Sequence, residues 1–504
     1  MFKFSLSFFN EYIKSDNYDT LNIFNDLTLA HEKFNLIFSA DKSIFSVYFI
    51  DILKFLTALK LKGKEVDFDI FPKHKSINVS VATWPYIGYG DLKNGIDVSS
   101  KIFGKGHLFP QNKLKKSIQA TVNSQYFLGK KYCSTVSVVS PKIDKGNNFL
   151  WLNARDIKTN LIEFNSDWFS VPQLNDQILL LRQLIFEICA KNSLPISHDV
   201  IQDLLESHIR ADCSEGEMDV KFDGDFLLLK SGVELQNRML SLAAVQQGTP
   251  VINVTHGEAF GIYDEPMFSK FGEQMFSNII LGYGEQIVAN KNTYKFGLKN
   301  DLMYVKSNAA NAFKYYVPEF HGIKKNFLNI KFYYYPTTLS GSTHRYGPYR
   351  DTPDVLYLSW QEYLFKLFGK SITIKLHPKE KYNKSFSFPD VKEVSGSFND
   401  LLKDIDVFVF DYIGTAFNEA CATNKPIIYF DLGIRNINIE ALKSIKQRTI
   451  YFNIEDGIPS KEDISDMLAF KERENTYTSK YSLSGNDESR VQSLSRSIKN
   501  YNPL

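Results

Sequence analysis

Short apolar runs and helical patterns alternate along the second half of the chain. Apolar runs suited to buried strands lie at residues 226–229, 251–255, 330–335, 372–376, 407–410 and 426–430. Segments with apolar residues at helical spacing lie between them, as at residues 355–369. Alternation of strands and helices favours parallel sheets made of strand–helix–strand units. We therefore predict an α/β fold with two doubly wound, Rossmann-like domains.

The first half of the chain has a less regular pattern. Residues 44–59 carry apolar side chains at helical spacing, and residues 171–190 have the pattern of a strong helix. Two alternating segments, 77–81 and 135–139, are typical of strands. The N-terminal half is therefore also expected to mix helices and strands.

Composition excludes several classes of protein. The 504 residues can bury sizeable cores, and 43% hydrophobic with 23% charged residues is ordinary for a globular protein. Lys+Arg (59) nearly balances Asp+Glu (57), so nothing indicates a nucleic-acid partner. The cysteines stand far apart, at Cys133, Cys189, Cys213 and Cys421. We expect no disulfide scaffold and no zinc site, and we interpret Asp223–Asp225 as a turn, so no metal or resident cofactor is predicted.

Features of membrane proteins are weak in this sequence. No run of about 18 apolar residues occurs, and the start of the chain lacks the apolar core of a signal peptide. We expect a cytoplasmic protein. The basic run 113–116 near Phe103, Leu108 and Phe109 predicts a solvated face, with peripheral association with the inner membrane as the alternative.

The segment after the strand at 372–376 could bind phosphate. His377 follows the strand directly, and Pro378 stiffens the turn and favours extended geometry at His377. An imidazole N–H there can donate to a phosphate, and Lys375 adds a cation. A histidine that bonds only to local backbone is the alternative interpretation.

A second candidate follows the strand at 407–410. Gly414 lets backbone approach a ligand, and Thr415 begins a helix whose free N–H groups and dipole favour an anion. Glu419 lies one turn further along, where a carboxylate can accept from ribose hydroxyls. A plain helix cap with a solvated glutamate is the alternative. Ligands of open α/β sheets bind outside the carboxyl ends of strands, where both candidates lie.

These two motifs carry a resemblance. The sequences KLHPKE (375–380) and DVFVFDYIGTAFNEACATNKPIIYFD (406–431) resemble the nucleotide-binding domain of GT-B glycosyltransferases of bacterial surface-polysaccharide synthesis. That group includes CMP-sugar enzymes for Kdo, sialic acid and other nonulosonic acids, and CDP-glycerol polymer transferases. The resemblance covers about residues 370–432 and implies two domains facing a cleft. It also implies that His377 and Thr415 hold the donor phosphate.

Candidate catalytic groups follow the strand at 251–255. His256 ends it, and Glu258 and Asp264 lie in the next loop, close to Glu265, while Glu234 begins an earlier helix. Glycosyl transfer needs a carboxylate at the anomeric carbon, as nucleophile or base. The order of these segments resembles transferases encoded with nonulosonic acid genes and, more distantly, retaining Kdo transferases. That resemblance implies a carboxylate nucleophile, for which Asp264 is the first choice and the other acids stay open.

Cations are expected on the leaving phosphate and on a sugar carboxylate. Arg238, Arg345 and Lys375 are the candidates, because guanidinium and ammonium groups pair with such anions. The predicted organisation is an N-terminal acceptor and catalytic domain (1–317), a linker (318–330), a nucleotide-donor domain (331–460) and a C-terminal helical tail (461–504).

The expected function is transfer of an acidic sugar, Kdo or another nonulosonic acid, from a CMP-activated donor. The expected acceptor is a glycan or lipid-linked glycan of bacterial surface polysaccharide, and the leading expectation is a retaining mechanism. The alternatives are a CDP-glycerol or UDP/GDP-sugar transferase on the same fold, and a nucleotide-sugar epimerase or binding protein.

Overall fold

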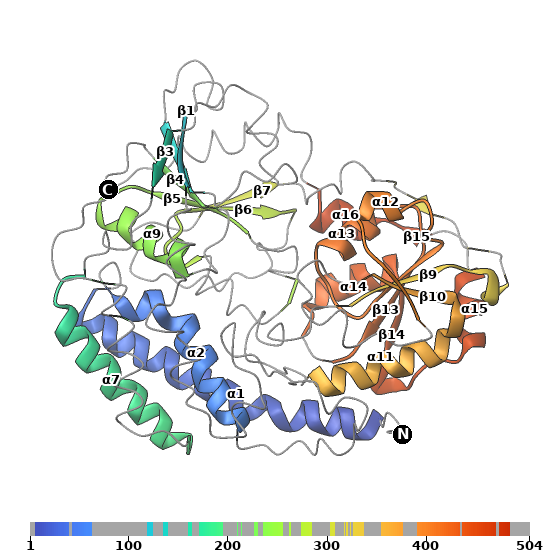
Figure 1. Cartoon of the computed structure of the whole chain (residues 1–504), viewed down its shortest axis with the longest axis horizontal. Coiled ribbons are helices and arrows are strands. Elements are labelled where there is room, and N and C mark those ends of the chain that lie inside the picture. The colour runs from blue at the N-terminus through green and yellow to red at the C-terminus, as the bar shows by residue number, and fades with distance from the viewer. Residues whose placement is uncertain are drawn as a thin grey trace.

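The computed structural model contains two large β-sheets, each of which forms a unit with the helices that accompany it (Figure 1). It describes residues 6–39, 43–62, 118–123, 135–139, 160–163, 171–194, 209, 213, 226–229, 235–255, 262–263, 274–284, 303–307, 317, 319–320, 323, 326–336, 354–375, 391–433, 436–469 and 473–483. The predicted α/β class is confirmed by these sheets.

The first sheet is mixed, with the order β3-β1-β2-β4-β5-β6-β7. Its strands are β1 (Ile118–Asn123), β2 (Thr135–Val139), β3 (Asn160–Glu163), β4 (Phe226–Leu229), β5 (Val251–Val254), β6 (Ile279–Tyr283) and β7 (Met303–Ser307). Strand β1 runs antiparallel to β2 and β3, whereas β2, β4, β5, β6 and β7 are mutually parallel. The predicted strands at 135–139, 226–229 and 251–255 are present, and the strand predicted at 77–81 lies outside the described residues.

Helices pack together beside this sheet (Figure 1). They are α1 (Leu6–Ile37), α2 (Ile44–Lys62), α7 (Leu174–Lys191) and α9 (Leu235–Gln246). Helix α1 contacts α2 and α7, and α2 contacts α9. Their buried apolar residues belong to one core, which explains why the helical patterns at 44–59 and 171–190 predicted helices correctly.

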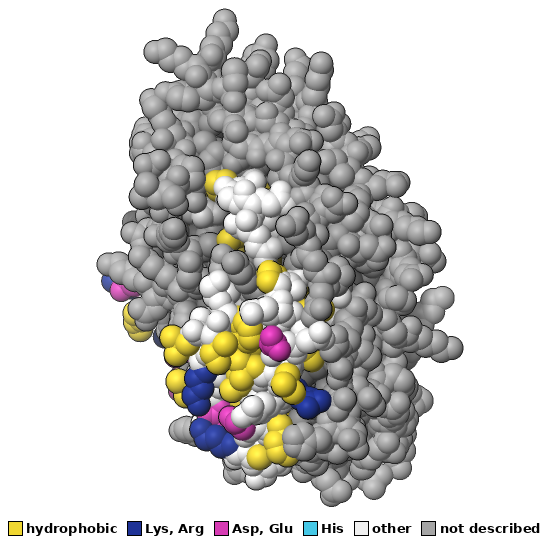
Figure 2. Space-filling model, turned by 90° about the vertical axis from the view of Figure 1, so that its left-hand side faces the viewer, with side chains coloured by type: hydrophobic (Ala, Val, Ile, Leu, Met, Phe, Trp, Pro, Cys, Tyr) yellow, Lys and Arg dark blue, Asp and Glu magenta, His cyan; other side chains and the backbone are white. Residues whose placement is uncertain are grey.

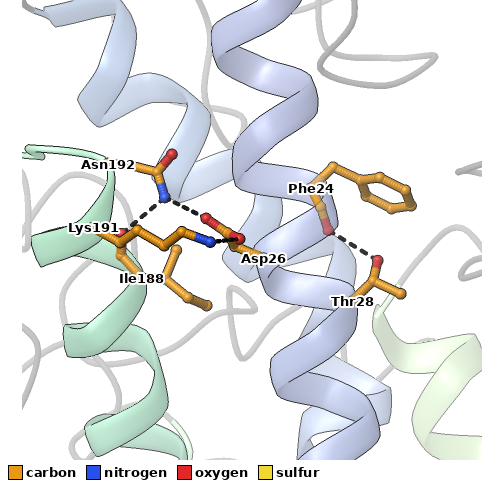
Figure 3. A network of polar contacts seen from close by, with 6 residues as sticks. All are labelled: Phe24, Asp26, Thr28, Ile188, Lys191 and Asn192. Atoms are coloured by element: carbon orange, nitrogen blue, oxygen red, sulfur yellow. Dashed lines mark hydrogen bonds and ion pairs between the residues drawn. The ribbon is translucent and has the colours of Figure 1, made fainter.

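The contact between α1 and α7 also has a polar part (Figure 3). Lys191 Nζ lies 2.6 Å from Asp26 Oδ1, and Asn192 Nδ2 donates to Asp26 Oδ2 at 2.9 Å. Asn192 Nδ2 also donates to the Ile188 carbonyl, so one amide ends α7 and holds α1. The Lys191 side chain is largely exposed, so water screens the ion pair and packing contributes more to this contact.

Apolar and charged side chains are interspersed on the outer face of these helices (Figure 2). Leu29, Leu36 and Ile37 of α1 and Leu179 of α7 are exposed. Exposed apolar side chains among charges are common on globular proteins. Within the described residues, no helix has the length and apolar character needed to cross a bilayer.

His31 of α1 is fully buried against α2. Its Nε2 lies 2.8 Å from Ser46 Oγ, and the rings of Phe45 and Phe49 meet it edge-on. Asn35 Nδ2 approaches the ring at 3.2 Å. Burial lowers the pKa of His31 to about 3, because the charged imidazolium loses its hydration.

We expect acid to weaken this helical core. The unfolded state takes up a proton below a pKa of about 6.5, which the folded state does not do until about pH 3, so acidification favours unfolding. Between pH 7.5 and pH 5 the loss is about 2 kcal/mol of unfolding free energy. Urea unfolding of wild type and His31→Gln at both pH values tests this. Equal pH slopes in the two proteins would contradict it.

The second sheet is wholly parallel, with the order β11-β10-β9-β12-β13-β14. Its strands are β9 (Phe332–Tyr335), β10 (Ile372–Lys375), β11 (Lys392–Val394), β12 (Val407–Phe410), β13 (Ile427–Asp431) and β14 (Ile450–Asn453). From β9 the chain adds strands first on one side and then on the other. This is the 3-2-1-4-5-6 order of a doubly wound nucleotide-binding sheet, and its order reverses between β9 and β12.

Helices flank this sheet, and they include the helices predicted at residues 355–369 and from Thr415. They are α11 (Asp354–Phe368), α12 (Phe398–Leu401), α13 (Thr415–Ala422), α14 (Ile439–Arg448), α15 (Lys461–Ala469) and α16 (Thr476–Tyr481), with 3-10 turns η7 (Phe327–Asn329), η9 (Gly369–Ser371) and η10 (Ile454–Asp456). In β9, Phe332 and Tyr334 join the core that contains Trp360 of α11, whereas Tyr333 and Tyr335 join the core that contains Phe417 of α13. A strand buried on both faces explains the unbroken FYYY run.

The segments predicted as linker and tail take part in the second unit. Strand β8 (Glu319–Phe320) pairs antiparallel with β15 (Arg473–Glu474). Tyr477 and Tyr481 of α16 are buried in the α13-side core. In the structure, residues 461–469 and 473–483 thus belong to the second unit, which was predicted to end at residue 460. Helix α1 also reaches this unit, where it contacts η10.

Candidate functional site

The reversal of strand order points to the carboxyl-terminal ends of the strands in the second sheet. We call this side, where the parallel strands end, the carboxyl edge of the sheet. The strand order reverses between β9 and β12, and ligands of such sheets bind outside the carboxyl ends of the strands at that point. Tyr335 ends β9, Lys375 ends the neighbouring β10, and Asp411 follows β12. Because the three strands are parallel, these residues share one edge of the sheet.

The loop from Asp411 to Gly414 leads directly into α13. Gly414 is the N-cap residue and provides no side-chain cap for the helix. A Cβ on Gly414 would lie 2.8 Å from Cε1 of Tyr412, so only glycine leaves room for that ring. The first turn of α13 therefore presents backbone N–H groups beside Thr415 at the positive end of the helix dipole.

Asp411 is buried and accepts three side-chain hydrogen bonds. Tyr334 Oη donates to Oδ2 at 2.5 Å, Trp360 Nε1 to Oδ2 at 2.9 Å, and Tyr357 Oη to Oδ1 at 2.9 Å. Burial raises the pKa of Asp411 to about 6, although the three donors oppose that shift. The cluster joins β9, α11 and the end of β12 at the base of the loop.

Lys375 is a buried cation at the same edge. Burial lowers its pKa, because desolvation disfavours the ammonium form. An anion bound beside Lys375 would favour the charged form. The predicted role of this lysine in phosphate binding thus fits its place in the sheet.

Tyr335 and Glu419 lie on the α13 side of the edge. The Tyr335 ring packs against Phe398, Phe408 and Phe410, and its hydroxyl is buried with no hydrogen-bond partner among the described residues. Burial, and after it the charge of Glu419, raises the pKa of Tyr335. Glu419 is itself buried, one turn beyond Thr415. An unsatisfied donor next to a carboxylate is an arrangement that a polar ligand group can complete.

The far end of α13 is held by a buried arginine. Arg448 Nε donates to the Cys421 carbonyl at 2.8 Å, and Nη2 donates to the carbonyls of Ala420, Thr423 and Lys425 at 3.2, 2.9 and 3.0 Å. A cation at the carboxyl end of a helix complements the helix dipole. Arg448 therefore fixes α13 from the end opposite Thr415.

Four of the predicted site residues lie at this edge. They are Lys375, Gly414, Thr415 and Glu419. Arg238 lies elsewhere, buried in α9, where its Nε donates to the Val47 carbonyl of α2 at 2.7 Å. That bond gives Arg238 a part in joining α9 to α2, and its predicted contact with an anion stays a prediction.

The remaining predicted residues lie outside the described residues. They are Glu234, His256, Glu258, Asp264, Arg345, His377 and Pro378. Their predicted roles stay predictions.

Sequence reasoning missed Asp411, Tyr335 and Arg448. An acid placed directly after a buried strand was a usable signal for Asp411. Tyr335 was part of a run of buried aromatics, and Arg448 lay in an ordinary amphipathic helix, so neither stood out in the sequence.

No group of three or more His, Cys, Asp or Glu residues with metal-binding geometry is present in the described part of the chain. No protein-family model and no curated protein matches the sequence. Among solved structures, a crystal structure described as the glycotransferase of kitacinnamycin is similar, with 11% identity and a TM-score of 0.30, over 66% of this chain and 81% of that chain. A TM-score this low carries no argument about fold or function.

Proposed function

We propose that the protein is a glycosyltransferase that uses a nucleotide-activated sugar. The observation that supports this is the reversal point of the second sheet, where the α13 N-terminus, Lys375 and the Tyr335 hydroxyl, which has no hydrogen-bond partner in the described part of the chain, lie at the same carboxyl ends of strands. Helix N-termini and cations at such an edge favour phosphate groups. The resemblance of residues 370–432 to GT-B transferases adds the sugar-transfer chemistry.

In this proposal each residue of the edge has a task. The backbone N–H groups at Thr415, together with Lys375 and His377, bind the donor phosphate and stabilise the charge that develops on it as it leaves. Glu419 accepts from the ribose hydroxyls, and Tyr335 donates to the ligand beside it. The Asp411 cluster holds the loop in the conformation that presents these N–H groups.

The donor that we propose is a CMP-activated acidic sugar such as Kdo or another nonulosonic acid. Its acceptor would be a glycan or lipid-linked glycan, reached in the cytoplasm or at the inner-membrane surface. Arg345 is the proposed partner of the sugar carboxylate. The resemblance to CMP-sugar enzymes motivates this donor. CDP-glycerol, UDP-sugars and GDP-sugars are the alternatives to exclude.

The proposed reaction proceeds by double displacement. A carboxylate, Asp264 in our proposal, attacks the anomeric carbon, the bond from that carbon to the phosphate oxygen of CMP breaks, and CMP leaves with the electron pair. The acceptor hydroxyl then attacks the anomeric carbon and loses its proton to His256 or Glu258. The bond to the carboxylate breaks, with configuration at the anomeric carbon retained, and the base passes its proton to water, which returns the enzyme to its first state.

Calorimetry with CMP, CDP, UDP and GDP tests the nucleotide. We expect CMP to bind, and Thr415→Val and His377→Ala each to weaken binding by about 1–3 kcal/mol, roughly 5- to 150-fold, the scale of hydrogen bonds to charged groups. Thr476→Val on α16, a threonine replaced at a different helix start, is the matched control and should bind CMP normally. Unchanged CMP affinity in both site variants would refute the site.

Transfer should proceed without a divalent metal. In the proposed site, helix N–H groups and cations neutralise the leaving phosphate, which makes a metal ion unnecessary for this task. Release of CMP from CMP-Kdo should therefore continue in EDTA. Activity that stops in EDTA and returns with Mg²⁺ or Mn²⁺ would contradict the expectation.

A further inference from the structure

The loop that follows β5 of the first sheet is anchored in the core of the second unit. Ile262 and Tyr263 are both buried, and both belong to the apolar core around α13. Tyr263 also forms an isolated antiparallel bridge with Ile437, and the Asn438 N–H donates to the Ile262 carbonyl at 2.8 Å. Two residues that follow a strand of one sheet are thus part of the other unit.

The Tyr263 hydroxyl meets the loop before α13. The Ile413 N–H donates to Tyr263 Oη at 3.2 Å. Ile413 is fully buried and directly precedes Gly414, the N-cap residue of α13. The Ile413 amide thus joins the segment before α13 to Tyr263. A change in the conformation of residues Asp411–Gly414 would therefore move this hydrogen bond.

The same loop is held on its other side by Asp411. Three donors from β9 and α11 fix the Asp411 carboxylate, and Tyr263 fixes the amide two residues later. Tyr263 also lies close enough to Tyr429 of β13 to raise the pKa of that phenol. The loop is therefore clamped between its own unit and a residue from the other.

We propose that Tyr263 is a positioning residue, which couples occupation of the nucleotide site at α13 to the loop after β5. The inference rests on the proposed function, because it takes the α13 N-terminus as the phosphate site. That loop contains His256 and Glu258 and leads into Asp264. Phosphate binding at α13 then stabilises the Ile413–Tyr263 contact. In this way, binding of the donor also positions the predicted catalytic segment relative to the donor.

Hydrogen exchange measured by mass spectrometry tests the contact first without nucleotide. Tyr263→Phe keeps the buried ring and removes the hydroxyl that accepts from the Ile413 N–H. We expect exchange of a peptide covering residues 411–418 to become about fivefold faster, the change expected for one lost neutral hydrogen bond. Tyr477→Phe is the matched control, because it removes another buried tyrosine hydroxyl that bonds to α13, at Asn418 Oδ1. If Tyr263→Phe accelerates exchange no more than the control does, the positioning role is overturned.

CMP is then added to the same three proteins. In wild type and Tyr477→Phe, CMP should slow exchange both at residues 411–418 and in a peptide containing Ile262 and Tyr263. In Tyr263→Phe, protection at 411–418 should remain while protection at Ile262–Tyr263 is lost. Protection confined to 411–418 in wild type would overturn the coupling and leave the nucleotide site intact. If CMP slows exchange in neither peptide, the proposed function is refuted, and the coupling with it. The exchange measured without nucleotide would still test the Ile413–Tyr263 hydrogen bond.

Discussion

Replacing Asp411 with alanine should destabilise the protein by about 2–5 kcal/mol at pH 5, the largest stability effect that we expect from one side chain of the second unit. The carboxylate is the shared acceptor of Tyr334, Tyr357 and Trp360. The two tyrosine hydroxyls lie 3.1 Å apart and can still bond to each other. The indole N–H and one hydroxyl would then lose the acceptor that Asp411 provides, at about 1–3 kcal/mol each.

Urea unfolding measures this effect, and the chain offers a control at the other end of the same strand. Asp406 Oδ2 accepts an exposed hydrogen bond from the Lys331 N–H at 3.0 Å. Asp406→Ala should cost less than about 1 kcal/mol, because water can replace that bond. Asp411→Asn should fall between the two, since an amide oxygen can accept two of the donors. An Asp411→Ala protein as stable as Asp406→Ala would show that the cluster contributes nothing to stability.

The cost of the Asp411 substitution should depend on pH. The folded pKa of about 6 lies above the value of 3.8 for a free carboxyl, so the folded state binds a proton where the unfolded state does not. Stability from this group is therefore gained as pH falls through 6, by about 1.4 kcal/mol between pH 7.5 and pH 5. Asp411→Asn lacks this gain. His31 has the opposite slope, but it is present in both proteins and cancels in their difference.

The periodicity and spacing of apolar residues in the sequence predicted most helices and strands of the second unit. The FYYY run, the segment from Val407 to Phe410 and the helix at Thr415 have local patterns that few other structures would satisfy. The pattern did not predict the order of the strands in the sheet, because the pairing of β9 with β12 joins residues far apart in the chain. The reversal point between β9 and β12 follows only from that pairing, whereas the two phosphate-binding candidates were already placed at strand ends by the sequence.

Individual partners were harder to predict than elements. Tyr334 and Asp411 are 77 positions apart, and no local rule brings a phenol to that carboxylate. Arg238 was a candidate anion ligand because it lies in the first turn of a helix that follows a strand. Its contact with Val47 depends on α2 packing over α9, which periodicity does not specify. Charged residues whose partners come from distant segments are therefore where sequence reasoning fails.

Asp264→Asn should abolish turnover while leaving CMP affinity unchanged. A nucleophilic carboxylate that becomes an amide cannot form the covalent intermediate, and loss of a nucleophile costs several powers of ten in rate. The nucleotide would be bound by α13 and Lys375, in the other unit, so its affinity should not depend on Asp264. The anchor at Ile262 and Tyr263 supports this choice, because Asp264 is the next residue in the chain after a side chain that contacts the α13 loop.

Release of CMP from CMP-Kdo, measured with and without a glycan acceptor, separates the candidate acids. Glu258→Gln should slow release only when acceptor is present, since we assign it to the second step, and Glu234→Gln is the comparison for an acid outside the loop. Intact-mass spectrometry of wild type with donor alone should detect a glycosyl adduct that Asp264→Asn lacks. An Asp264→Asn enzyme with more than about a tenth of wild-type turnover would exclude Asp264 as the nucleophile, because a missing nucleophile cannot be compensated to that degree. The nucleophile would then be the carboxylate whose replacement abolishes both the adduct and the release of CMP.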